Sequence, residues 1–447
     1  MRFSLTFDVT DGVGSGEQLT QHGWGFLPER PAGTRAVLLC LAGGTYDKHY
    51  WHLDVPGHPG YSFGQHLAAA GFVVIAVDHL GIGDSTDPIA SGPLGLKLLA
   101  KGDAEVARQI RERLRRGDLH QDLPAALPVV GVGHSMGACL TTMVQATARP
   151  YDAVVLLGYG VQITNVYEDT ADTAELEERI QQTIEASCQL AGAKPTDAHV
   201  YAPRGYLANL FYAGEVPQDV IDADTAVQSR VPLRAAAEVT TPGMVEQYAP
   251  RVDVPVFLAF GAALDVSPNP YAEPTNYTGS PDVTLHLVPN SGHCHNFASH
   301  RTELWDRIAI WLPTVVSVGE PVDALGEHVP NIVGFLGAGQ LGEPMVGRLL
   351  DGGYDVVVYA RREDLRRRLE AKGAAVTDSV ADLARDSDIL ISCLFSDAQL
   401  RETGLGADGF IANAKPGAVF VSHTTGTLST LEALRDSASS ALVILDA

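Results

Sequence analysis

The feature that most constrains the fold is a glycine–serine turn that joins an apolar run to a run of small residues. The apolar run, residues 128–134, is β-branched and nearly continuous, as in strands buried on both faces of a parallel sheet. Gly133-His134-Ser135-Met136-Gly137 ends this run and precedes a small-residue helical segment. The two glycines allow a sharp strand-to-helix turn that exposes the Ser135 hydroxyl at the helix N-terminus. The segment therefore predicts an α/β fold with Ser135 as a candidate nucleophile.

Similar apolar runs recur along the first three quarters of the chain and favour a largely parallel sheet. The stretch 61–70 has helical spacing and ends before a glycine, which is a common helix stop. From about 161 to 251 the strand pattern gives way to helical sequence, which predicts a helical cap inserted between two strands. The predicted strands lie at 35–45, 71–78, 128–134, 153–160, 254–261 and 283–289.

The chain is strongly acidic, with 31 Lys and Arg against 54 Asp and Glu and a formal net charge of −23. This charge argues against nucleic-acid and anionic membrane partners, which attract basic surfaces. The five cysteines are scattered and show no zinc spacing, so neither a disulfide framework nor a metal site is expected. The N-terminus has no signal-peptide core, and no apolar run approaches the ~20 residues of a membrane span. We therefore expect a cytoplasmic protein whose oligomeric state the sequence leaves open.

One candidate acid and two candidate bases follow Ser135 along the chain. Serine needs a base to accept its proton and an acid to orient that base. Asp265 lies just after one predicted strand, and His293 and His295 lie just after the next. His293, which directly follows a glycine, is the preferred base, and His295 is the alternative.

A tetrahedral intermediate also needs backbone donors aimed at its oxyanion. The amide of Met136, next to the nucleophile, is one candidate. The second is expected from the glycine-containing loop 42–46, at Gly44.

These segments resemble the α/β-hydrolase superfamily over about 280 residues including the cap. The loop Asp78–Ser85 is similar to the D-x-x-G-x-G-x-S loop of that family. Because the nucleophile is a serine rather than an aspartate, the resemblance implies hydrolysis or acyl transfer on an ester, thioester or lactone, with a small-molecule acyl substrate. Four cap aromatics are candidates to line an acyl pocket, although such residues also pack cap helices: Tyr201, Tyr206, Phe211 and Tyr212.

A second glycine-rich turn follows the apolar strand predicted at 331–336. Gly337-Ala338-Gly339-Gln340-Leu341-Gly342 has the G-x-G-x-x-G spacing of a dinucleotide-binding Rossmann turn at a helix N-terminus. At the end of the next predicted strand, where an acid would bind the ribose hydroxyls of NAD, the chain has Arg361 and Arg362. Two guanidiniums suit a 2′-phosphate, so NADP is preferred over NAD.

Residues from about 330 to 447 resemble the NADP-binding domain of the β-hydroxyacid dehydrogenase family. The resemblance places Leu394 in a loop that flanks the nicotinamide and Thr424 in the segment of the D-x-S-T motif, where Ser422 replaces the usual Asp. In that family the chain continues into a helical domain that carries the catalytic lysine. We therefore expect this half to bind a cofactor without a complete dehydrogenase site.

The expected domains are an α/β-hydrolase domain at 1–312, a linker at 313–330 and an incomplete Rossmann domain at 331–447. Three hypotheses follow from this arrangement. The first is a serine hydrolase fused to an NADP-binding domain. The alternatives are a bifunctional hydrolase–3-hydroxyacid dehydrogenase whose last domain is missing from this chain, and a non-enzymatic cofactor-sensing fusion.

Overall fold

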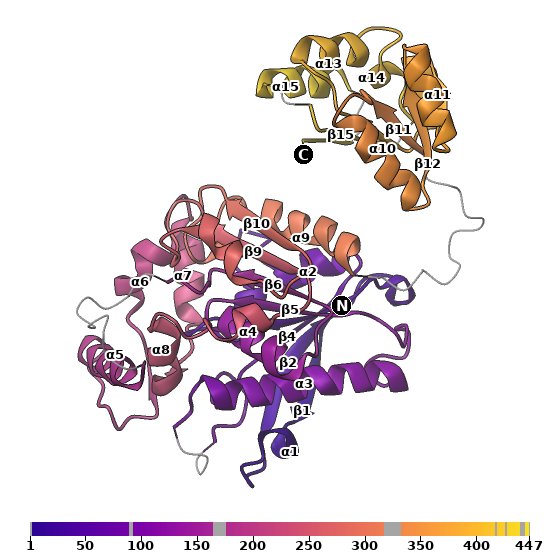
Figure 1. Ribbon diagram of the computed structural model, residues 1–447. Helices are drawn as coiled ribbons and strands as arrows, with labels where there is room; N and C mark the ends of the chain where they lie inside the picture. Colours follow the sequence, from indigo (N-terminus) through magenta and orange to yellow (C-terminus); the bar gives the residue numbers. More distant parts are fainter. Residues whose placement is uncertain are drawn as a thin grey trace. The chain divides into compact units, whose positions relative to one another are not determined.

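The structure is a computed structural model that describes residues 2–88, 93–163, 176–316, 332–415, 418–424, 427–438 and 443–446. The chain divides into two compact units, Met1–Ala324 and Leu325–Ala447, each with its own large sheet (Figure 1). The predicted linker, 313–330, lies mostly outside the described residues. Its first three residues belong to helix α9 (Arg301–Val315) instead.

The first unit is built on an eight-stranded sheet in the order β1-β2-β4-β3-β5-β6-β9-β10. Neighbours from β4 to β10 are parallel, so the carboxyl ends of six strands meet at one edge of the sheet. This edge is where α/β proteins place their binding sites. The parallel strands are β3 (Val37–Leu41), β4 (Val73–Val77), β5 (Val129–His134), β6 (Ala153–Leu157), β9 (Val256–Gly261) and β10 (Val283–Val288).

An N-terminal hairpin, β1 (Arg2–Asp8) and β2 (Thr20–Phe26), extends this sheet in the antiparallel sense. No strand was expected before residue 35, because β2 contains two glycines and several polar residues. The reason for one glycine is steric. A Cβ on Gly23 would lie 2.5 Å from the carbonyl oxygen of Ala76 in β4.

Helices cover both faces of the first sheet, so successive strand residues enter two different cores. Val37, Leu39 and Leu41 of β3 pack in the core formed with α3 (Leu96–Arg116) and α4 (Met136–Ala148). Leu38 and Cys40 pack in the core formed with α2 (Phe63–Ala69) and α9. This two-sided burial explains the continuous apolar runs of the strands.

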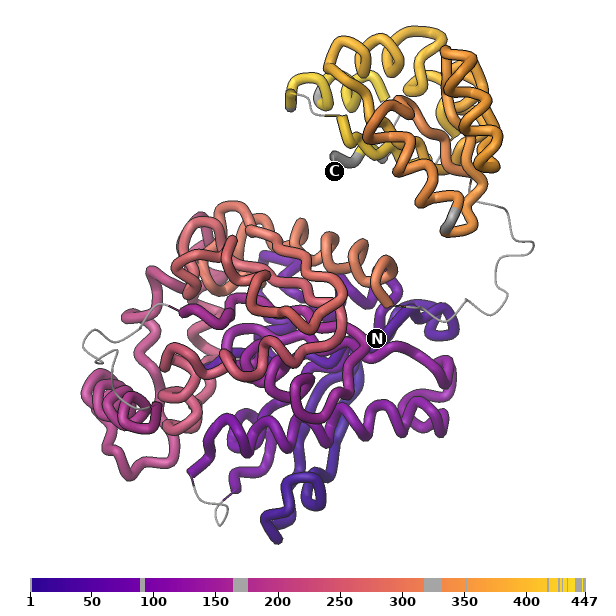
Figure 2. The backbone as a smooth tube through the Cα atoms, in the orientation of Figure 1, coloured from indigo at the N-terminus to yellow at the C-terminus, as the bar shows by residue number. Residues whose placement is uncertain are grey.

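The predicted cap lies between β6 and β9 and is largely helical. Its segments gather on one side of the first unit (Figure 2). Residues 164–175, at its start, lie outside the described residues. The helices of the cap are α5 (Leu176–Ala191), α6 (Arg204–Phe211), α7 (Gln218–Ala226) and α8 (Leu233–Thr240), with a two-stranded sheet of β7 (His199–Val200) and β8 (Val231–Pro232).

The second unit has six parallel strands in the order β13-β12-β11-β14-β15-β16. In chain order this is 3-2-1-4-5-6, the doubly wound arrangement that binds dinucleotides where the strand order reverses. The reversal lies between β11 and β14. The strands are β11 (Ile332–Leu336), β12 (Asp355–Tyr359), β13 (Ala375–Thr377), β14 (Ile389–Ser392), β15 (Val419–Ser422) and β16 (Val443–Asp446).

Two cores flank this second sheet. Helices α10 (Gly342–Asp351) and α11 (Glu363–Ala371) pack on one face. The other face is covered by α12 (Val380–Asp386), α13 (Asp397–Gly404), α14 (Phe410–Asn413) and α15 (Leu428–Ser437).

Candidate active site and cofactor site

Ser135 is the only residue between strand β5 and helix α4, and its backbone is strained. Its φ is 52° and its ψ is −117°, outside the regions that non-glycine residues favour. Its N–H donates to the carbonyl oxygen of Leu157 at 2.8 Å, which ties the turn to β6. The side chain is half-buried rather than enclosed. The turn therefore presents the hydroxyl at the carboxyl edge of the sheet.

The two flanking glycines are required by close backbone contacts. A Cβ on Gly133 would lie 2.3 Å from the carbonyl oxygen of Gly137. A Cβ on Gly137 would lie 1.9 Å from the carbonyl oxygen of Leu41 in β3. Each distance is shorter than any real Cβ contact, so no other residue fits without a shift of the main chain. These close backbone contacts explain why glycine occupies both positions of the G-x-S-x-G motif.

Asp265 lies in the loop after β9 and is anchored at several points. Its side chain is almost completely buried, and its carboxylate accepts hydrogen bonds from the amides of Gly261 and Val266, both at 2.7 Å. Burial alone would raise the pKa of this carboxyl, but the charges and hydrogen bonds of His293 and His295 outweigh burial and hold the pKa well below its ordinary value. Asp265 is therefore an ionised acid between two imidazoles.

The two candidate bases bind the same carboxylate but lie in different surroundings. Nδ1 of His293 is 2.7 Å from one Asp265 oxygen, which leaves Nε2 of that ring for another partner. Nε2 of His295 is 2.9 Å from the other oxygen, and its Nδ1 is buried without a hydrogen-bond partner. His293 borders the same cavity as Ser135. His295 is completely buried and is not among the residues that line this cavity.

A third histidine, His134, for which the sequence predicted no role, supports this arrangement. Its Nε2–H donates to the carbonyl oxygen of His293 at 2.8 Å, and its ring stacks on Tyr50 with centroids 4.3 Å apart. Burial, together with the neighbouring His293 and His295, holds the pKa of His134 well below its ordinary value. His134 is therefore a neutral ring that fixes the backbone of His293. Its position inside the G-x-S-x-G motif is the one sequence signal for this contact.

The loop 42–46, which we call the oxyanion loop, packs against the nucleophile. A Cβ on Gly43 would lie 3.0 Å from the Cβ of Ser135, closer than most Cβ contacts in proteins, so glycine at this position favours the close approach of the two backbones. Gly44 and Thr45 line the cavity beside Ser135. The other expected donor, the amide of Met136, lies at the first residue of α4. The residues predicted to bind an oxyanion thus come from segments that meet at Ser135.

The cavity that Ser135 and His293 share is small and apolar. Its volume is about 120 Å³. Apolar cavities of ~150 Å³ hold a benzene-sized group, so a short acyl or small aryl group matches this space. Most of its walls come from the cap, including Val200, Leu207, Leu210, Phe211, Val231 and Val239.

The cap aromatics fulfil the sequence expectation only in part. Tyr206 and Phe211 line the cavity, as predicted. Tyr201 is 63% exposed, and Tyr212 donates its hydroxyl to the buried Asp224, so both were wrong as lining residues. Aromatic side chains on adjoining turns of the cap point in different directions, which composition alone does not reveal.

The loop Asp78–Ser85 has a structural explanation. Asp78 is completely buried, and its carboxylate accepts from the amide of Lys48 at 2.7 Å, from the ammonium of Lys48 at 2.6 Å and from the amide of Asp84 at 3.0 Å. A Cβ on Gly83 would lie 2.2 Å from this carboxylate. The acid and the glycine therefore hold the conformation of this loop.

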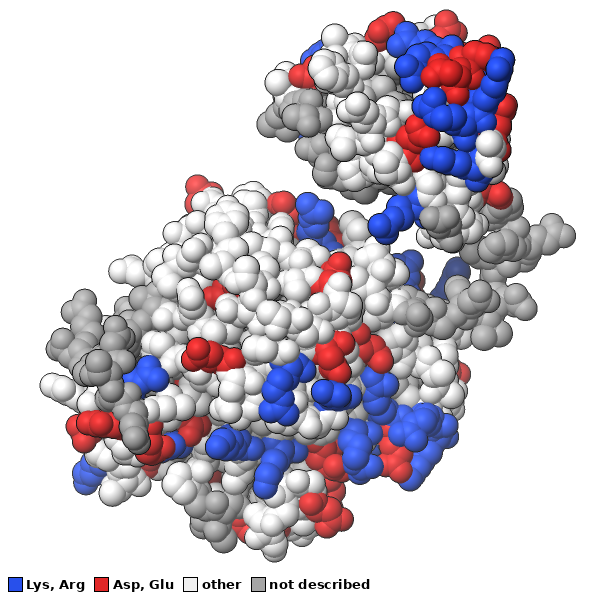
Figure 3. Space-filling model, viewed as in Figure 1, with Lys and Arg blue, Asp and Glu red and all other residues white. Residues whose placement is uncertain are grey.

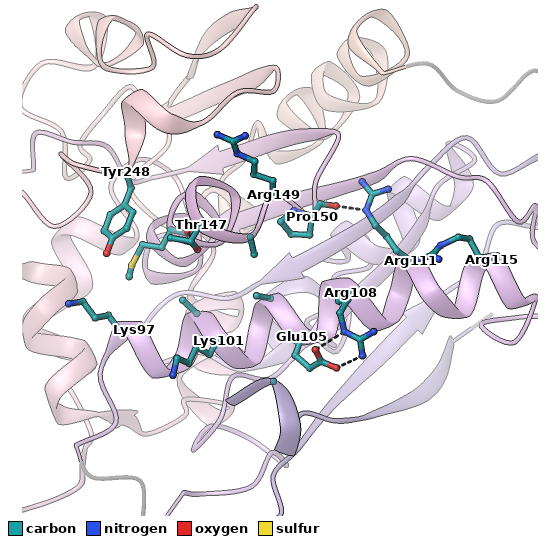
Figure 4. Close-up of a pocket in the computed structure, with 15 residues that line it drawn as sticks. Lys97, Lys101, Glu105, Arg108, Arg111, Arg115, Thr147, Arg149, Pro150 and Tyr248 are labelled. Atoms are coloured by element: carbon teal, nitrogen blue, oxygen red, sulfur yellow. Dashed lines mark hydrogen bonds and ion pairs between the residues drawn. The ribbon is translucent and has the colours of Figure 1, made fainter. Parts of the chain in front are cut away.

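A larger cavity, of about 750 Å³, lies between α3 and the end of α4 and is lined by cations (Figure 4). The basic side chains of α3 also stand out on this face of the first unit in Figure 3. Thr147, in its wall, is eleven residues beyond the first residue of α4, about 16 Å along the helix. Because none of its lining residues belongs to the Ser135–His293–Asp265 set, its larger size does not mark it as the reaction site.

The glycine-rich turn of the second unit follows β11 and opens α10, and its three glycines differ in their surroundings. Gly337 has a φ of 95°, and a Cβ there would lie 2.3 Å from the carbonyl oxygen of Cys393. A Cβ on Gly342 would lie 2.2 Å from the carbonyl oxygen of Gly337. Gly339 has no atom within 4 Å of such a position. Gly337 thus permits the tight turn, and Gly342 permits close packing of the helix. Gly339 leaves an open approach for a pyrophosphate.

The other predicted cofactor residues border the same edge of the second sheet. Gln340 and Leu341 are exposed in the turn, and Arg361 and Arg362 are exposed just beyond β12. The hydroxyl of the buried Thr424 accepts from the amide of Leu394 at 3.0 Å and lies 3.1 Å from the hydroxyl of Ser392. Thr424 thus joins the loops after β14 and β15.

The described ranges contain neither a candidate membrane span nor a candidate metal cluster. No helix there is long and apolar enough to cross a membrane. No group of three or more His, Cys, Asp or Glu side chains suited to a metal ion occurs among the described side chains.

Two family models match the chain, one in each unit. The model described as "Alpha/beta hydrolase family" matches residues 37–307, well over half of the chain. The model described as "NAD binding domain of 6-phosphogluconate dehydrogenase" matches residues 332–447.

Individual proteins match parts of the chain. An uncharacterised oxidoreductase of Bacillus subtilis is 34% identical over 116 residues, which are 26% of this chain and 40% of that protein. The mitochondrial 3-hydroxyisobutyrate dehydrogenase of Homo sapiens is 31% identical over 93 residues, 21% of this chain and 28% of that protein. The solved structure of a thermophilic esterase from Thermogutta terrifontis is 16% identical, covering 70% of this chain and 98% of its own, with a TM-score of 0.47. The chain spans two fifths or less of the length of these curated relatives.

Proposed function

The chain belongs to the alpha/beta hydrolase family and carries an NAD-binding domain of the 6-phosphogluconate dehydrogenase type, and from this premise we propose that it is a serine hydrolase with Ser135 as nucleophile, His293 as base and Asp265 as acid. The observation that carries the proposal is the bond between His293 Nδ1 and Asp265, on a ring that shares a cavity with Ser135. His293 is preferred to His295 because His295 does not border that cavity.

The proposed reaction has two steps. In the first, Ser135 Oγ attacks the acyl carbonyl carbon and its proton passes to Nε2 of His293, while the amides of Met136 and Gly44 bind the oxyanion. The intermediate then collapses, and His293 returns the proton to the leaving alcohol or thiol. In the second step, His293 takes a proton from a water molecule that attacks the acyl carbon. The bond between Ser135 Oγ and the acyl carbon then breaks, His293 returns the proton to Oγ, and the carboxylic acid leaves.

The proposed substrate is an ester, thioester or lactone with a short acyl group. The cavity of about 120 Å³ supports a short chain or a small ring. Its apolar cap residues supply no counter-charge, which favours an uncharged acyl group. Turnover of p-nitrophenyl acetate and butyrate should therefore exceed turnover of the decanoate at equal concentration.

Labelling by a fluorophosphonate probe tests the nucleophile directly. The wild-type protein should form a covalent adduct that peptide mapping places on Ser135, and the variant Ser135→Ala should lose both the adduct and ester turnover. Ser299→Ala, which changes an exposed serine, is the matched control and should keep both. An adduct on another residue, or full turnover by Ser135→Ala, would contradict the proposal.

We also propose that the second unit prefers NADP to NAD. The support is the pair Arg361 and Arg362, exposed beyond β12 where a ribose 2′ group is read. The double variant R361A/R362A should weaken NADPH binding at least about 10-fold and leave NADH binding nearly unchanged, because two charge-assisted contacts to a phosphate are lost. Arg367→Ala, an exposed arginine of α11 paired with Glu363, is the control. Equal affinity for both cofactors in the wild type would refute the preference.

The NAD-binding domain favours one further candidate, a second, oxidoreductase activity. In the bifunctional alternative the dehydrogenase domain with the catalytic residues is missing from this chain, so this alternative is tested by whether the source gene encodes further residues after Ala447. NADPH binding without any labelling of Ser135 would instead support a cofactor-sensing fusion.

A further inference from the structure

Thr45 of the oxyanion loop has a backbone conformation that its side chain disfavours. The amide of Tyr46 donates to the carbonyl oxygen of Gly43 at 3.2 Å, so residues 43–46 form a tight turn with Thr45 in its third position. The φ of Thr45 is 70°. A type II turn requires positive φ there and normally carries glycine, whereas a β-branched residue pays a steric cost. Something outside the turn must therefore hold Thr45 in place.

The cap supplies two contacts to this one residue. Nη1 of Arg204, the first residue of α6, donates to Oγ1 of Thr45 at 2.6 Å. The amide of Ser229, between α7 and β8, donates to the carbonyl oxygen of Thr45 at 2.9 Å. The cap, which covers the acyl cavity, thus holds Thr45 through both its side chain and its main chain.

The side chain of Arg204 is almost completely buried, which is unusual for a cation. It is 8% exposed, and its guanidinium lies 4.3 Å from the ring centroid of Tyr46 and 5.2 Å from that of Phe211. Its Nε is 3.4 Å from the carboxylate of Asp224, yet Nε and Nη2 make no hydrogen bond. A buried pair with unused donors contributes little to stability. Its bond to Thr45 is the shortest and best-formed polar contact of this side chain.

Asp224 holds the other side of the turn. It is completely buried and accepts hydrogen bonds from the hydroxyls of Tyr46, at 3.1 Å, and Tyr212. The acid therefore fixes Tyr46, the last residue of the turn, while its partner Arg204 fixes Thr45. A single buried ion pair of the cap thus contacts both residues that define the end of the oxyanion loop.

We propose that Arg204 is a positioning residue that, through Thr45, sets the backbone donors of the oxyanion loop while the cap is docked. If Thr45 relaxes to negative φ, the peptide between Gly44 and Thr45 must rotate, because turn types with opposite signs of φ at this position orient that peptide differently. The rotation reverses the directions of the Gly44 carbonyl group and the Thr45 N–H in the wall of the cavity beside Ser135. These are the backbone groups next to the Gly44 amide, the proposed oxyanion donor. The inference rests on the proposed serine hydrolase function, because it concerns donors to the oxyanion.

A pair of substitutions tests the inference through the strain at Thr45. Arg204→Met keeps an unbranched side chain but removes the donors, and it should lower kcat for p-nitrophenyl acetate about 10-fold or more with KM within about 2-fold, because the loss falls on the transition state. Thr45→Gly accepts positive φ without a steric cost. In the Thr45→Gly background the Arg204→Met substitution should therefore lower kcat by less than about 3-fold.

The controls separate positioning from folding and from the proposed function. Thermal unfolding of each variant reports the fold, and Thr45→Val, which removes the acceptor hydroxyl and leaves Arg204 in place, should lose kcat as Arg204→Met does. An equal loss of kcat for Arg204→Met in both backgrounds, or a rise in KM alone, would overturn the inference. Failure of the proposed function would instead appear in the wild-type protein, as the absence of fluorophosphonate labelling at Ser135.

Discussion

Oδ1 of Asp265 lies 2.7 Å from Nδ1 of His293, while the other oxygen of the same carboxylate binds a second imidazole that is completely buried. One acid thus serves two rings, of which one faces the cavity. His293 borders the cavity that Ser135 also borders, and His295 does not, which is why we propose His293 as the base. The second ring holds the carboxylate in place and contributes to its low pKa.

Because only one of the two rings borders the cavity, replacing His293 should slow labelling of Ser135 far more than replacing His295. His293→Gln should lower the rate of fluorophosphonate labelling at least about 10³-fold, because the general base is lost. His295→Gln keeps an amide donor near the carboxylate and should lower the rate less than about 10-fold. Circular dichroism checks that both variants are folded. If the labelling rate then falls more in His295→Gln than in His293→Gln, the assignment of the base is reversed.

The glycines of the nucleophile turn predict a stability difference that is independent of catalysis. Gly137→Ala would place a methyl group 1.9 Å from the carbonyl oxygen of Leu41 and should lower the free energy of unfolding by about 1–3 kcal/mol or more, since the main chain of two elements must move apart. Gly33→Ala, where no atom lies within 4 Å, should change it by less than about 0.5 kcal/mol. Urea denaturation measures both, and equal stability of the two variants would contradict the clash.

The sequence predicted these features because their causes are local. A strand, a glycine clash and a helix start all lie within residues 128–148, and two-sided burial of the strands produces long apolar runs that are easy to recognise. The alternation of strands and helices was then sufficient to predict the fold. The loop positions of Ser135, Asp265 and His293 were sufficient to select them as candidates, and their catalytic roles stay predictions.

The features that sequence reasoning missed depend on contacts between distant segments. Arg204 meets Thr45 across 159 residues, and no periodicity records that pairing. The hairpin strand β2 contains glycines because its neighbours lie close: a Cβ on Gly23 would meet the backbone of β4, and a Cβ on Gly25 would meet the ring of Phe3 in β1. The role of His134 depends on the carbonyl oxygen of His293, which the loop after β10 brings to it.

The neutral His134 predicts a pH dependence of stability. Its pKa is lowered in the folded protein, first by burial and then by His293 and His295, so the unfolded chain binds a proton near pH 6.5 that the folded chain does not. Stability from this residue is fully present above about pH 7.5 and is lost as pH falls below about 6.5, with a slope that approaches about 1.4 kcal/mol per pH unit. The free energy of unfolding of His134→Asn should fall less steeply than that of wild type between pH 7 and pH 5. Parallel curves for the two proteins would show that His134 does not titrate in this way.

The second unit offers a matched pair of glycines for the cofactor site. Gly339 has open space where its Cβ would lie, whereas a Cβ on Gly342 would lie 2.2 Å from the carbonyl oxygen of Gly337. If the open space at Gly339 receives the pyrophosphate, Gly339→Ala should leave the melting temperature of the second unit unchanged but weaken NADPH binding at least about 10-fold, since the added methyl group blocks the backbone approach. Gly342→Ala should lower the melting temperature in the absence of cofactor, because helix α10 must move away from the turn. Differential scanning calorimetry and NADPH fluorescence titration measure the two effects, and a Gly339→Ala variant with wild-type affinity would place the pyrophosphate elsewhere.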